Sequence, residues 1–363
     1  MRRKTRRGQA AFHAKLKMKL HDRQLGPSHP AFLIAEIGIN HNGDMALALA
    51  AIDAAVKAGA DAVKFQNYET EDFVSDPTLT FTYRSQGREI TESQYELFKR
   101  CELSETMLME LASHCAEKGT CFLSTPTGDR GVEALVRAGC PALKNGSDFL
   151  GHLPLIKKMA RTGLPTMLST GMATGSEIAE AVDTFRGAGG TDLILLHCVS
   201  AYPAPAESVN LGKLATLRDR FDCLVGFSDH TEGNDAAALA VACGACVVEK
   251  HFTLDHGLPG PDHWFSSTPS EFSELVRRVR RTELMLGSSA LEPAGAEAMG
   301  RREYRLSCVA ARDLAPGTLI SSDTLAYHRP GIGLPPRDAG RLVGRRLRTG
   351  LRRGDPILED HLE

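Results

Sequence analysis

The chain has 363 residues, of which 42% are hydrophobic and 24% charged, and its formal net charge is −2. This length is enough for one large domain of about 250 residues and a second, small one, and the composition is that of a globular protein. The nearly balanced charge gives no whole-chain field that would favour nucleic acid or a membrane surface, so we expect neither as a partner.

The chain begins with a basic segment, MRRKTRRGQAAFHAKLKMKL, which contains no acidic residue. A signal peptide would need an apolar core followed by a small-residue cleavage site, and neither is evident. We therefore expect residues 1–23 to form a disordered, solvated tail, with nucleic-acid binding by this tail as the weaker alternative. Elsewhere no apolar run approaches the roughly 18–20 residues that span a bilayer.

Nine cysteines are scattered along the chain without a disulfide framework. Cys243 and Cys246 form a CxxC, but no second pair accompanies it, so we expect structural thiols rather than a metal or redox site. Unpaired thiols indicate a reducing compartment, and we expect a cytoplasmic protein.

Apolar runs of strand length alternate with helical patterns between residues 32 and 285. Their continuous Val, Ile and Leu character is typical of parallel strands buried on both faces. Eight such units predict an α/β fold, a (β/α)8 TIM barrel over residues 24–286. A doubly wound open sheet is the alternative, but no strand is followed by GxGxxG. The predicted strands are Phe32–Glu36, Ala62–Gln66, Cys121–Ser124, Ala142–Gly146, Thr166–Ser169, Leu193–His197, Leu224–Ser228 and Cys246–His251.

Three further segments complete the predicted organisation. Asn67–Leu103 is too long for an ordinary connection, which is typical of a lid or an oligomer contact. Residues 287–303 are rich in small residues and predict a linker. Residues 304–363 contain short strand patterns and many turns, and predict a separate small β-rich domain.

Polar side chains follow most of the predicted strands, and in a barrel of parallel strands these ends meet at the rim that carries the chemistry. His230 and His251 end neighbouring strands, where two neutral imidazoles could hold a divalent metal. Lys64 and Lys144 also lie near strand ends. A buried lysine needs an anionic partner, so two of them among hydroxyl groups indicate a phosphate and carboxylate site.

Each of these residues also has a purely structural interpretation. A single strand-end lysine is often half-exposed, and Ser169 or Ser228 alone could cap the following helix. His41 and His197 are interpreted as buried supporting groups. The agreement among eight strand ends favours a joint site, because independent helix caps would not produce it.

Several longer motifs occur in a recognisable order. They are AEIGINHNGD, AGADAVKFQ, FLSTP, LSTGM, LLHC…AYPAP, GFSDHT, GACVVEKHFTLD, PGPDH and, near the end, VAARDLAPGTLISSDTLAYHRPG. Over residues 24–363 this order resembles the sialic acid synthase (N-acetylneuraminate synthase) family, and residues 304–363 resemble that family's antifreeze-like (SAF) domain.

The resemblance implies an enzyme that condenses phosphoenolpyruvate with N-acetylmannosamine or a related N-acetylated hexosamine. The product would be N-acetylneuraminate or a close analogue, formed with release of phosphate. The resemblance also implies a divalent metal, Mn²⁺ with Mg²⁺ or Co²⁺ as alternatives, and a domain-swapped homodimer.

Individual residues correspond to the functional groups of that family. His230 and His251 correspond to metal ligands, and Glu36 and Glu249 to catalytic carboxylates. The residues that correspond to phosphoenolpyruvate-binding groups are Lys64, Thr125, Lys144, Ser147, Ser169, Ser200 and Ser228. Those that correspond to sugar-binding groups are Gln66, Tyr202, Asp262 and Arg329, the last presented by the SAF domain to the partner's active site.

The chain departs from the family pattern at two places. Ser200 stands where some members have Asn. After Lys144 the chain reads NGSDF where IGSGE is common, which leaves the contact at Asp148 open. Other functions also remain open: a legionaminic or pseudaminic acid synthase, a synthase of a 9-phosphate product, a Schiff-base aldolase using Lys64 or Lys144, or a catalytically silent binding protein whose working part is the SAF domain.

Overall fold

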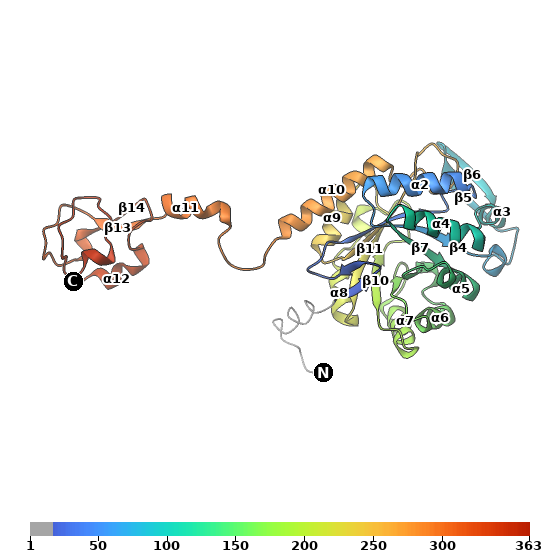
Figure 1. The fold of residues 1–363 in the computed structure, drawn as a ribbon, viewed down its shortest axis with the longest axis horizontal. Helices are drawn as coiled ribbons and strands as arrows, with labels where there is room; N and C mark the ends of the chain where they lie inside the picture. Colours follow the sequence, from blue (N-terminus) through green and yellow to red (C-terminus); the bar gives the residue numbers. More distant parts are fainter. Residues whose placement is uncertain (1–16) are drawn as a thin grey trace. The chain divides into compact units, whose positions relative to one another are not determined.

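The computed structural model describes residues 17–363, and the chain divides into two compact units, residues 1–287 and 288–363 (Figure 1). The first unit contains one sheet of eight parallel strands in the order β7-β4-β3-β12-β11-β10-β9-β8. Helices surround these strands, and the described residues form no ladder between β7 and β8, so the barrel is nearly closed. The predicted TIM-barrel fold is therefore confirmed, and the open-sheet alternative is wrong.

The barrel strands agree closely with the apolar runs of the sequence. Their bounds are β3 Phe32–Gly38, β4 Ala62–Asn67, β7 Cys121–Pro126, β8 Leu143–Asn145, β9 Thr166–Ser169, β10 Leu193–Cys198, β11 Leu224–Asp229 and β12 Val247–His251. The surrounding helices are α2 Met45–Ala58, α4 Glu105–Glu117, α5 Asp129–Arg137, α6 Leu153–Arg161, α7 Gly175–Gly187, α8 Lys213–Phe221, α9 Asp235–Ala242 and α10 Pro269–Leu286.

Local signals fix where the helices begin and end. The Asp44 side chain accepts hydrogen bonds from the backbone N–H groups of Ala46 and Leu47. At its other end α2 is followed by Gly59, whose φ of +95° suits a left-handed cap. In α7, Thr174 and Glu177 form a reciprocal capping box. These caps orient each helix against the strands that carry the site.

The core lies between the strands and the helices. All seven residues of β3 are buried, and Phe65, Phe227, Phe252 and Phe272 are among the largest fully buried side chains. Burying one such side chain stabilises the fold by about 1.5–3 kcal/mol. Because this apolar layer is dense and continuous, it can hold polar groups in place at the strand ends.

The described residues before the barrel include a short hairpin. β1 (Met18–Leu20) and β2 (Arg23–Leu25) form an antiparallel hairpin. Its residues Met18, Leu20 and Leu25 join the barrel core. The prediction of a disordered tail is thus wrong for residues 17–23, where alternating apolar side chains bury one face of the hairpin; residues 1–16 lie outside the described residues.

The long segment after β4 contains a second hairpin, formed by β5 (Thr80–Ser85) and β6 (Arg88–Ser93), and then helix α3 (Gln94–Arg100). The tip of this hairpin contacts the loop after β12: Gln86 Nε2 donates to Gly257 O at 2.8 Å, and the backbone N–H of Gly260 donates to Ser85 Oγ at 3.1 Å. The segment therefore stands over the same side of the barrel as the strand ends.

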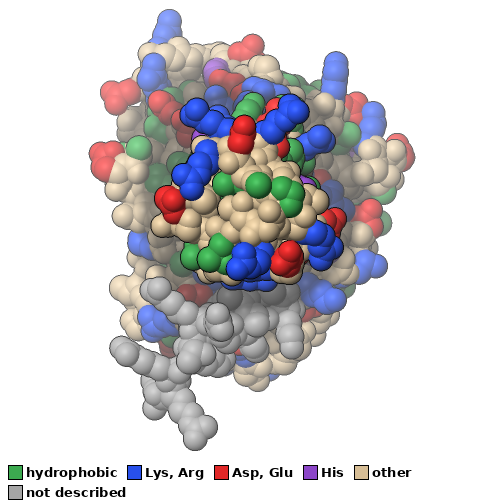
Figure 2. Space-filling view, turned by 90° about the vertical axis from the view of Figure 1, so that its left-hand side faces the viewer, with side chains coloured by type: hydrophobic (Ala, Val, Ile, Leu, Met, Phe, Trp, Pro, Cys, Tyr) green, Lys and Arg blue, Asp and Glu red, His purple; other side chains and the backbone are tan. Residues whose placement is uncertain are grey.

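The second unit has its own small core. β13 (Ser307–Ala310) pairs antiparallel with β14 (Leu325–His328), and the unit also contains helices α11 (Ala298–Glu303) and α12 (Ala339–Leu342). Its buried cluster includes Ile320, Leu347 and Ile357. Helix α11 lies in the segment that the sequence predicts only as a linker. Figure 2 is turned toward this unit and shows basic side chains around its edge.

Two smaller predictions can be compared with the structure. Cys243 is exposed and Cys246 is buried, and both are free thiols. Among residues 17–363, no helix has the combination of length and apolar character that crossing a bilayer requires.

Candidate active site

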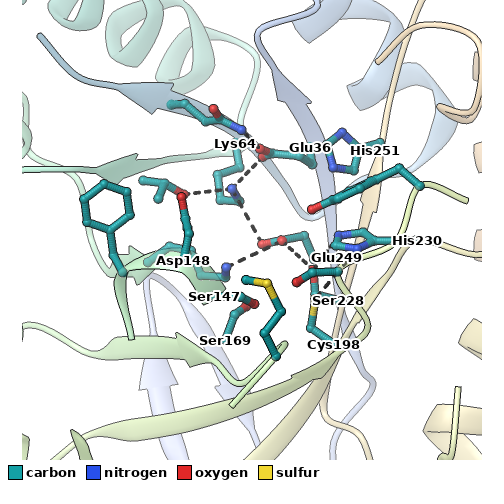
Figure 3. Close-up of a pocket in the computed structure, with 18 of the residues that line it drawn as sticks. Glu36, Lys64, Ser147, Asp148, Ser169, Cys198, Ser228, His230, Glu249 and His251 are labelled. Carbon is teal, nitrogen blue, oxygen red and sulfur yellow. Dashed lines mark hydrogen bonds and ion pairs between the residues drawn. The ribbon is translucent and has the colours of Figure 1, made fainter. Parts of the chain in front are cut away.

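A cavity of about 400 Å³ opens at the carboxyl ends of the barrel strands (Figure 3). Every one of the eight strands contributes to its lining, from Glu36 on β3 to His251 on β12. The structure brings together in this cavity all but two of the predicted site residues, namely Glu36, Lys64, Gln66, Thr125, Lys144, Ser147, Ser169, Ser200, Tyr202, Ser228, His230, Glu249 and His251.

Two buried lysines form the polar centre of the cavity. Lys64 Nζ lies 2.7 Å from Glu36 Oε2 and donates to Thr125 Oγ1 at 2.9 Å. Glu249 lies between the lysines: its Oε2 is 3.8 Å from Lys64 Nζ, and its Oε1 is 3.7 Å from Lys144 Nζ. These four charged side chains are at most 6% exposed, so each depends on the others for compensation.

The two carboxylates differ in their environments. Burial raises the pKa of Glu36 to about 7, although the charge of Lys64 opposes this change. Burial would also raise the pKa of Glu249, but the charges of Lys144 and Lys64 outweigh it and hold that pKa at about 2. One carboxyl group can thus exchange a proton near neutral pH, while the other stays ionised.

The lysines also differ from each other. Burial lowers the pKa of Lys144, and the charge of Glu249 offsets this only in part. For Lys64 the charges of Glu249 and Glu36 outweigh burial, and its pKa is raised. Lys64 therefore provides a fixed positive charge.

The two histidine rings lie side by side on one wall, with centroids 5.5 Å apart. His230 Nδ1 lies 2.8 Å from the carbonyl oxygen of Val199, the hydrogen bond expected of a protonated Nδ1, and the other ring nitrogen, Nε2, is 3.4 Å from Ser228 Oγ. His251 Nδ1 is buried without a hydrogen-bond partner and lies 3.9 Å from Asp262 Oδ2. Burial holds the pKa of His251 well below its usual value, so this ring is neutral and offers a lone pair.

These rings fit part of a metal site. Two imidazoles with available ring nitrogens supply two ligands, which leaves other positions for water and substrate. Among the described residues, no group of three or more His, Cys, Asp or Glu side chains is arranged to hold an ion by itself.

Several buried hydroxyl groups have no protein partner. Ser169 Oγ and Ser200 Oγ are both buried without a hydrogen bond. Ser147 Oγ, in contrast, accepts from the backbone N–H of Gly171 at 3.0 Å. Buried polar groups are normally paired, so these unpaired groups indicate that a polar ligand belongs here.

A second cavity, of about 770 Å³, shares Gln66, Ser200, Tyr202 and His251 with the first. Asp262 lines it, and burial raises the pKa of this carboxyl group to about 6. The β5–β6 hairpin and the loop after β12 supply much of its remaining wall, including Phe81, Arg84, Trp264 and Phe265, and helix α3 adds Leu97 and Phe98. The Arg84 guanidinium lies over the Trp264 ring, 5.3 Å from its centroid.

Three residues that the sequence analysis named lie elsewhere: the predicted site residue Arg329, and His41 and His197, which it interpreted as supporting groups. Arg329 is in the second unit, exposed, with its guanidinium 5.5 Å from the centroid of the Tyr304 ring. His41 and His197 line neither cavity; both are buried, and His197 Nε2 is hydrogen-bonded to Val209 O. Their role as supporting groups stays a prediction.

The cavity also contains residues that the sequence analysis did not assign to it. Cys198 lines the wall with its Sγ 3.7 Å from His230 Nδ1, and Asp148, Met172, Thr127 and Phe149 line other parts. The alternation of side chains along β10 contained the signal for Cys198, because it places Cys198 on the opposite side from His197.

Comparison with known proteins agrees with this geometry. The NeuB family matches residues 51–290, and the SAF domain matches residues 307–363. The N,N'-diacetyllegionaminic acid synthase of Legionella pneumophila is 40% identical over 93% of this chain and 96% of its own length. The N-acetylneuraminate-9-phosphate synthase of Homo sapiens is 33% identical over 93% of this chain and 94% of its own length.

A solved structure shows the same relationship. The N-acetylneuraminic acid synthetase of Leptospira borgpetersenii, in complex with citrate, is 34% identical and superimposes with a TM-score of 0.71 over 78% of this chain and 94% of its own. The chain therefore belongs to the NeuB family and carries a C-terminal SAF domain.

Proposed function

We propose that the protein is a nonulosonic acid synthase, which condenses phosphoenolpyruvate with an N-acetylated hexosamine and releases phosphate. The observation that carries this proposal is the buried arrangement of Lys64, Lys144, Glu36 and Glu249 at the rim to which all eight strands contribute. The relationship to legionaminic acid and N-acetylneuraminate-9-phosphate synthases supports it.

Phosphoenolpyruvate would bind over the two lysines. Its phosphate and carboxylate need positive charge and several hydrogen-bond donors in a site that excludes water. Lys64 and Lys144 supply the charge, and the unpaired hydroxyl groups of Ser169 and Ser200 are suited to donate. Thr125, Ser147 and Ser228 line the same cavity and complete the proposed set.

The proposed reaction forms one C–C bond and one C–O bond to water, and it breaks the C–O bond to phosphate. C3 of phosphoenolpyruvate attacks C1 of the open-chain sugar, whose aldehyde oxygen takes up a proton. Water then adds at C2 and loses one proton. The C2–O bond to phosphate breaks, and the new C2 hydroxyl loses its proton to leave the keto group of the product. Glu36 is placed to move these protons because its pKa is about 7, whereas the ionised Glu249 stabilises positive charge on the lysines and at C2.

His230 and His251 would hold a divalent ion, Mn²⁺ with Mg²⁺ or Co²⁺ as alternatives. When bound there, such an ion supplies Lewis acidity to the sugar's carbonyl oxygen. The unpartnered Nδ1 of His251 and the short separation of the two rings support this proposal.

The sugar would extend from the first cavity toward the second, past Gln66, Tyr202 and Asp262. N-acetylmannosamine is our first candidate, with N-acetylneuraminate as the product. One observation favours a second candidate, a doubly acylated hexosamine of the legionaminic type. The second cavity is roomy, and Phe81, Trp264 and Phe265 give it the apolar surface that an additional acetyl or methyl group would contact.

We further propose that Arg329 acts in a partner's site within a domain-swapped homodimer, and that the protein works in the cytoplasm. An exposed guanidinium stacked on Tyr304 is held ready for an external ligand, and planar Arg suits recognition of an acetamido oxygen better than Lys does. The nine free thiols support a reducing compartment.

The test is phosphate release from phosphoenolpyruvate with a panel of sugars: N-acetylmannosamine, its 6-phosphate, and 2,4-diacetamido-2,4,6-trideoxyhexoses. Each reaction is run with Mn²⁺ and with chelator, and the products are weighed by mass spectrometry. We expect sugar-dependent phosphate release and a product whose mass equals sugar plus pyruvate. Failure of every sugar to stimulate phosphate release in the presence of Mn²⁺ would refute the proposal.

A further inference from the structure

A buried ion pair lies beside the two histidines but outside the cavity. Lys250 Nζ is 2.9 Å from Asp229 Oδ2, and the two side chains are 4% and 0% exposed. Asp229 and Lys250 are register partners on the neighbouring parallel strands β11 and β12. In sequence, Asp229 directly precedes His230, and Lys250 directly precedes His251.

The hydrogen bonds of this pair enclose the backbone of His230. Asp229 Oδ1 accepts from the Thr231 N–H at 2.9 Å and from Thr231 Oγ1 at 2.8 Å, which spans His230. Lys250 Nζ also donates to the Thr231 carbonyl oxygen at 2.7 Å. The residues on both sides of His230 are thus joined to the residue before His251.

The pair faces away from the substrate side. Side chains alternate along a strand, so Asp229 and Lys250 point opposite to Ser228 and Glu249, which line the cavity. Neither Asp229 nor Lys250 lines either cavity of the site. A direct role for the pair in binding phosphoenolpyruvate or the sugar is therefore ruled out by its position.

The His251 ring packs against the rings of Tyr202, Phe265 and His230, and its backbone sets where it stands along the rim. Its Nδ1 has no hydrogen-bond partner, whereas His230 Nδ1 is bonded to the Val199 carbonyl oxygen. A buried ion pair contributes little net stability compared with apolar side chains of the same volume, so stability alone does not account for this one. Its distinctive property is that it joins two strand ends at a fixed separation.

We propose that Asp229 and Lys250 are positioning residues, which set the separation and orientation of the His230 and His251 rings and so determine how tightly the site holds a divalent ion. The inference rests on the proposed function in one respect, the ion itself. It goes further by assigning a role to two residues that contact neither substrate nor ion. Supporting groups behind metal ligands of this kind change metal affinity by roughly 10–100-fold when they are lost.

The test uses the full-length protein and Mn²⁺ alone, with free Mn²⁺ measured by electron paramagnetic resonance. The double variant Asp229→Asn/Lys250→Met removes both charges together, so no uncompensated charge is left buried, and the new Asn can still accept from Thr231. We expect its Mn²⁺ affinity to fall by at least about 10-fold while phosphoenolpyruvate affinity changes by less than about twofold.

The matched control is Asp61→Asn at the other end of the barrel. Asp61 is a partly buried carboxylate that is likewise paired with cations, Arg23 at 2.6 Å and Arg280 at 3.1 Å, and it precedes β4. We expect this variant to have a lower Tm and unchanged Mn²⁺ affinity. A merely structural pair at Asp229 and Lys250 would give the same result as this control.

Retention of Mn²⁺ affinity within about twofold in a folded double variant would overturn the inference. If the double variant does not fold, Thr231→Val removes only the hydroxyl bond to Asp229, and it should still weaken Mn²⁺ binding; unchanged affinity there would overturn the inference equally. Absence of Mn²⁺ binding that depends on His230 and His251 in the unaltered protein would overturn it too. Phosphate release measures the condensation separately from Mn²⁺ binding. The proposed function and the proposed role of the ion pair can therefore fail independently.

Discussion

Lys64 Nζ lies 2.7 Å from Glu36 Oε2, and the two side chains are 3% and 2% exposed. This contact links a fixed positive charge to the carboxyl group whose pKa, raised mainly by burial, is about 7. A proton-exchanging group is thus placed directly beside the charge that would hold an anionic substrate.

Glu36→Gln removes that proton carrier and keeps the size of the side chain. We expect kcat to fall by about 10²- to 10⁴-fold, the range for loss of a general acid or base, with little change in the KM for phosphoenolpyruvate. Steady-state phosphate release measures both. A variant with normal turnover would show that Glu36 moves no proton in the reaction.

The pH dependence follows from the same group. Because activation of water needs ionised Glu36, kcat should rise as pH passes through about 7, and Glu36→Gln should lack this rise. Phosphate release measured across this pH range tests both.

The stability of the folded protein should change with pH in the opposite direction to kcat. Between the ordinary glutamate pKa of 4.5 and about 7 the folded protein keeps a proton that the unfolded chain releases, so the free energy of unfolding falls by roughly 3 kcal/mol across this interval. Urea unfolding of the unaltered protein and of Glu36→Gln at pH 5 and pH 7.5 measures this loss of stability. An equal change in the free energy of unfolding between the two pH values in both proteins would contradict the raised pKa of Glu36.

Glu249→Gln should affect turnover far more than substrate binding. The change leaves Lys64 and Lys144 without their shared carboxylate, so the cavity becomes more positive and should keep or gain affinity for phosphoenolpyruvate. Breaking a buried charge arrangement in this way typically costs about 3–5 kcal/mol of stability. Calorimetric titration with phosphoenolpyruvate and thermal unfolding measure the two effects. Loss of affinity for phosphoenolpyruvate together with an unchanged kcat would contradict this prediction.

The lowered pKa of Lys144, caused mainly by burial, is also what a Schiff-base aldolase would need. We nevertheless expect no covalent adduct when the protein is treated with borohydride in the presence of phosphoenolpyruvate and sugar, and we expect chelator to abolish activity. Peptide mass spectrometry after trapping is decisive. A reduced adduct on Lys144 or Lys64 would replace the condensation mechanism with an aldolase mechanism.

Arg329→Ala should raise the KM for the sugar and leave Mn²⁺ affinity unchanged. If the arginine acts in a partner's site, subunit exchange between Arg329→Ala and Glu36→Gln should restore activity, because a mixed dimer then contains one intact site. With random exchange about a quarter of the sites would be active. No gain above the sum of the two separate variants, or an active monomer in ultracentrifugation, would show that the arginine does not act in trans.

How much of the fold the sequence predicts depends on how regular its patterns are. β9 at Thr166–Ser169 agrees with the prediction residue for residue, because all four of its residues are buried and turn residues bound the run. The β1–β2 hairpin was missed because its apolar residues alternate with charges inside a basic segment, and such short alternation is hidden by composition.

The site residues also divide into those that a local sequence pattern predicts and those that it does not. Strand ends predicted a shared rim, and thirteen predicted residues line one cavity. Cys198 was missed although the period of two along β10 would have found it. The ion pair of Asp229 and Lys250, unlike Cys198, could not be found from the pattern within one strand. Its partners lie 21 positions apart, and only the register of β11 against β12 brings them together. No local pattern contains that register.

The most direct test of the account uses phosphoenolpyruvate labelled with ¹⁸O in the oxygen that bridges carbon and phosphorus. With Mn²⁺ and an accepted N-acetylated hexosamine, we predict that one phosphate is released per C–C bond formed and that this phosphate carries the ¹⁸O label, because the C–O bond breaks at C2. Phosphate released without label, or released without a matching nine-carbon keto acid, would contradict the central claim that the lysine-lined rim condenses an enol phosphate with a sugar.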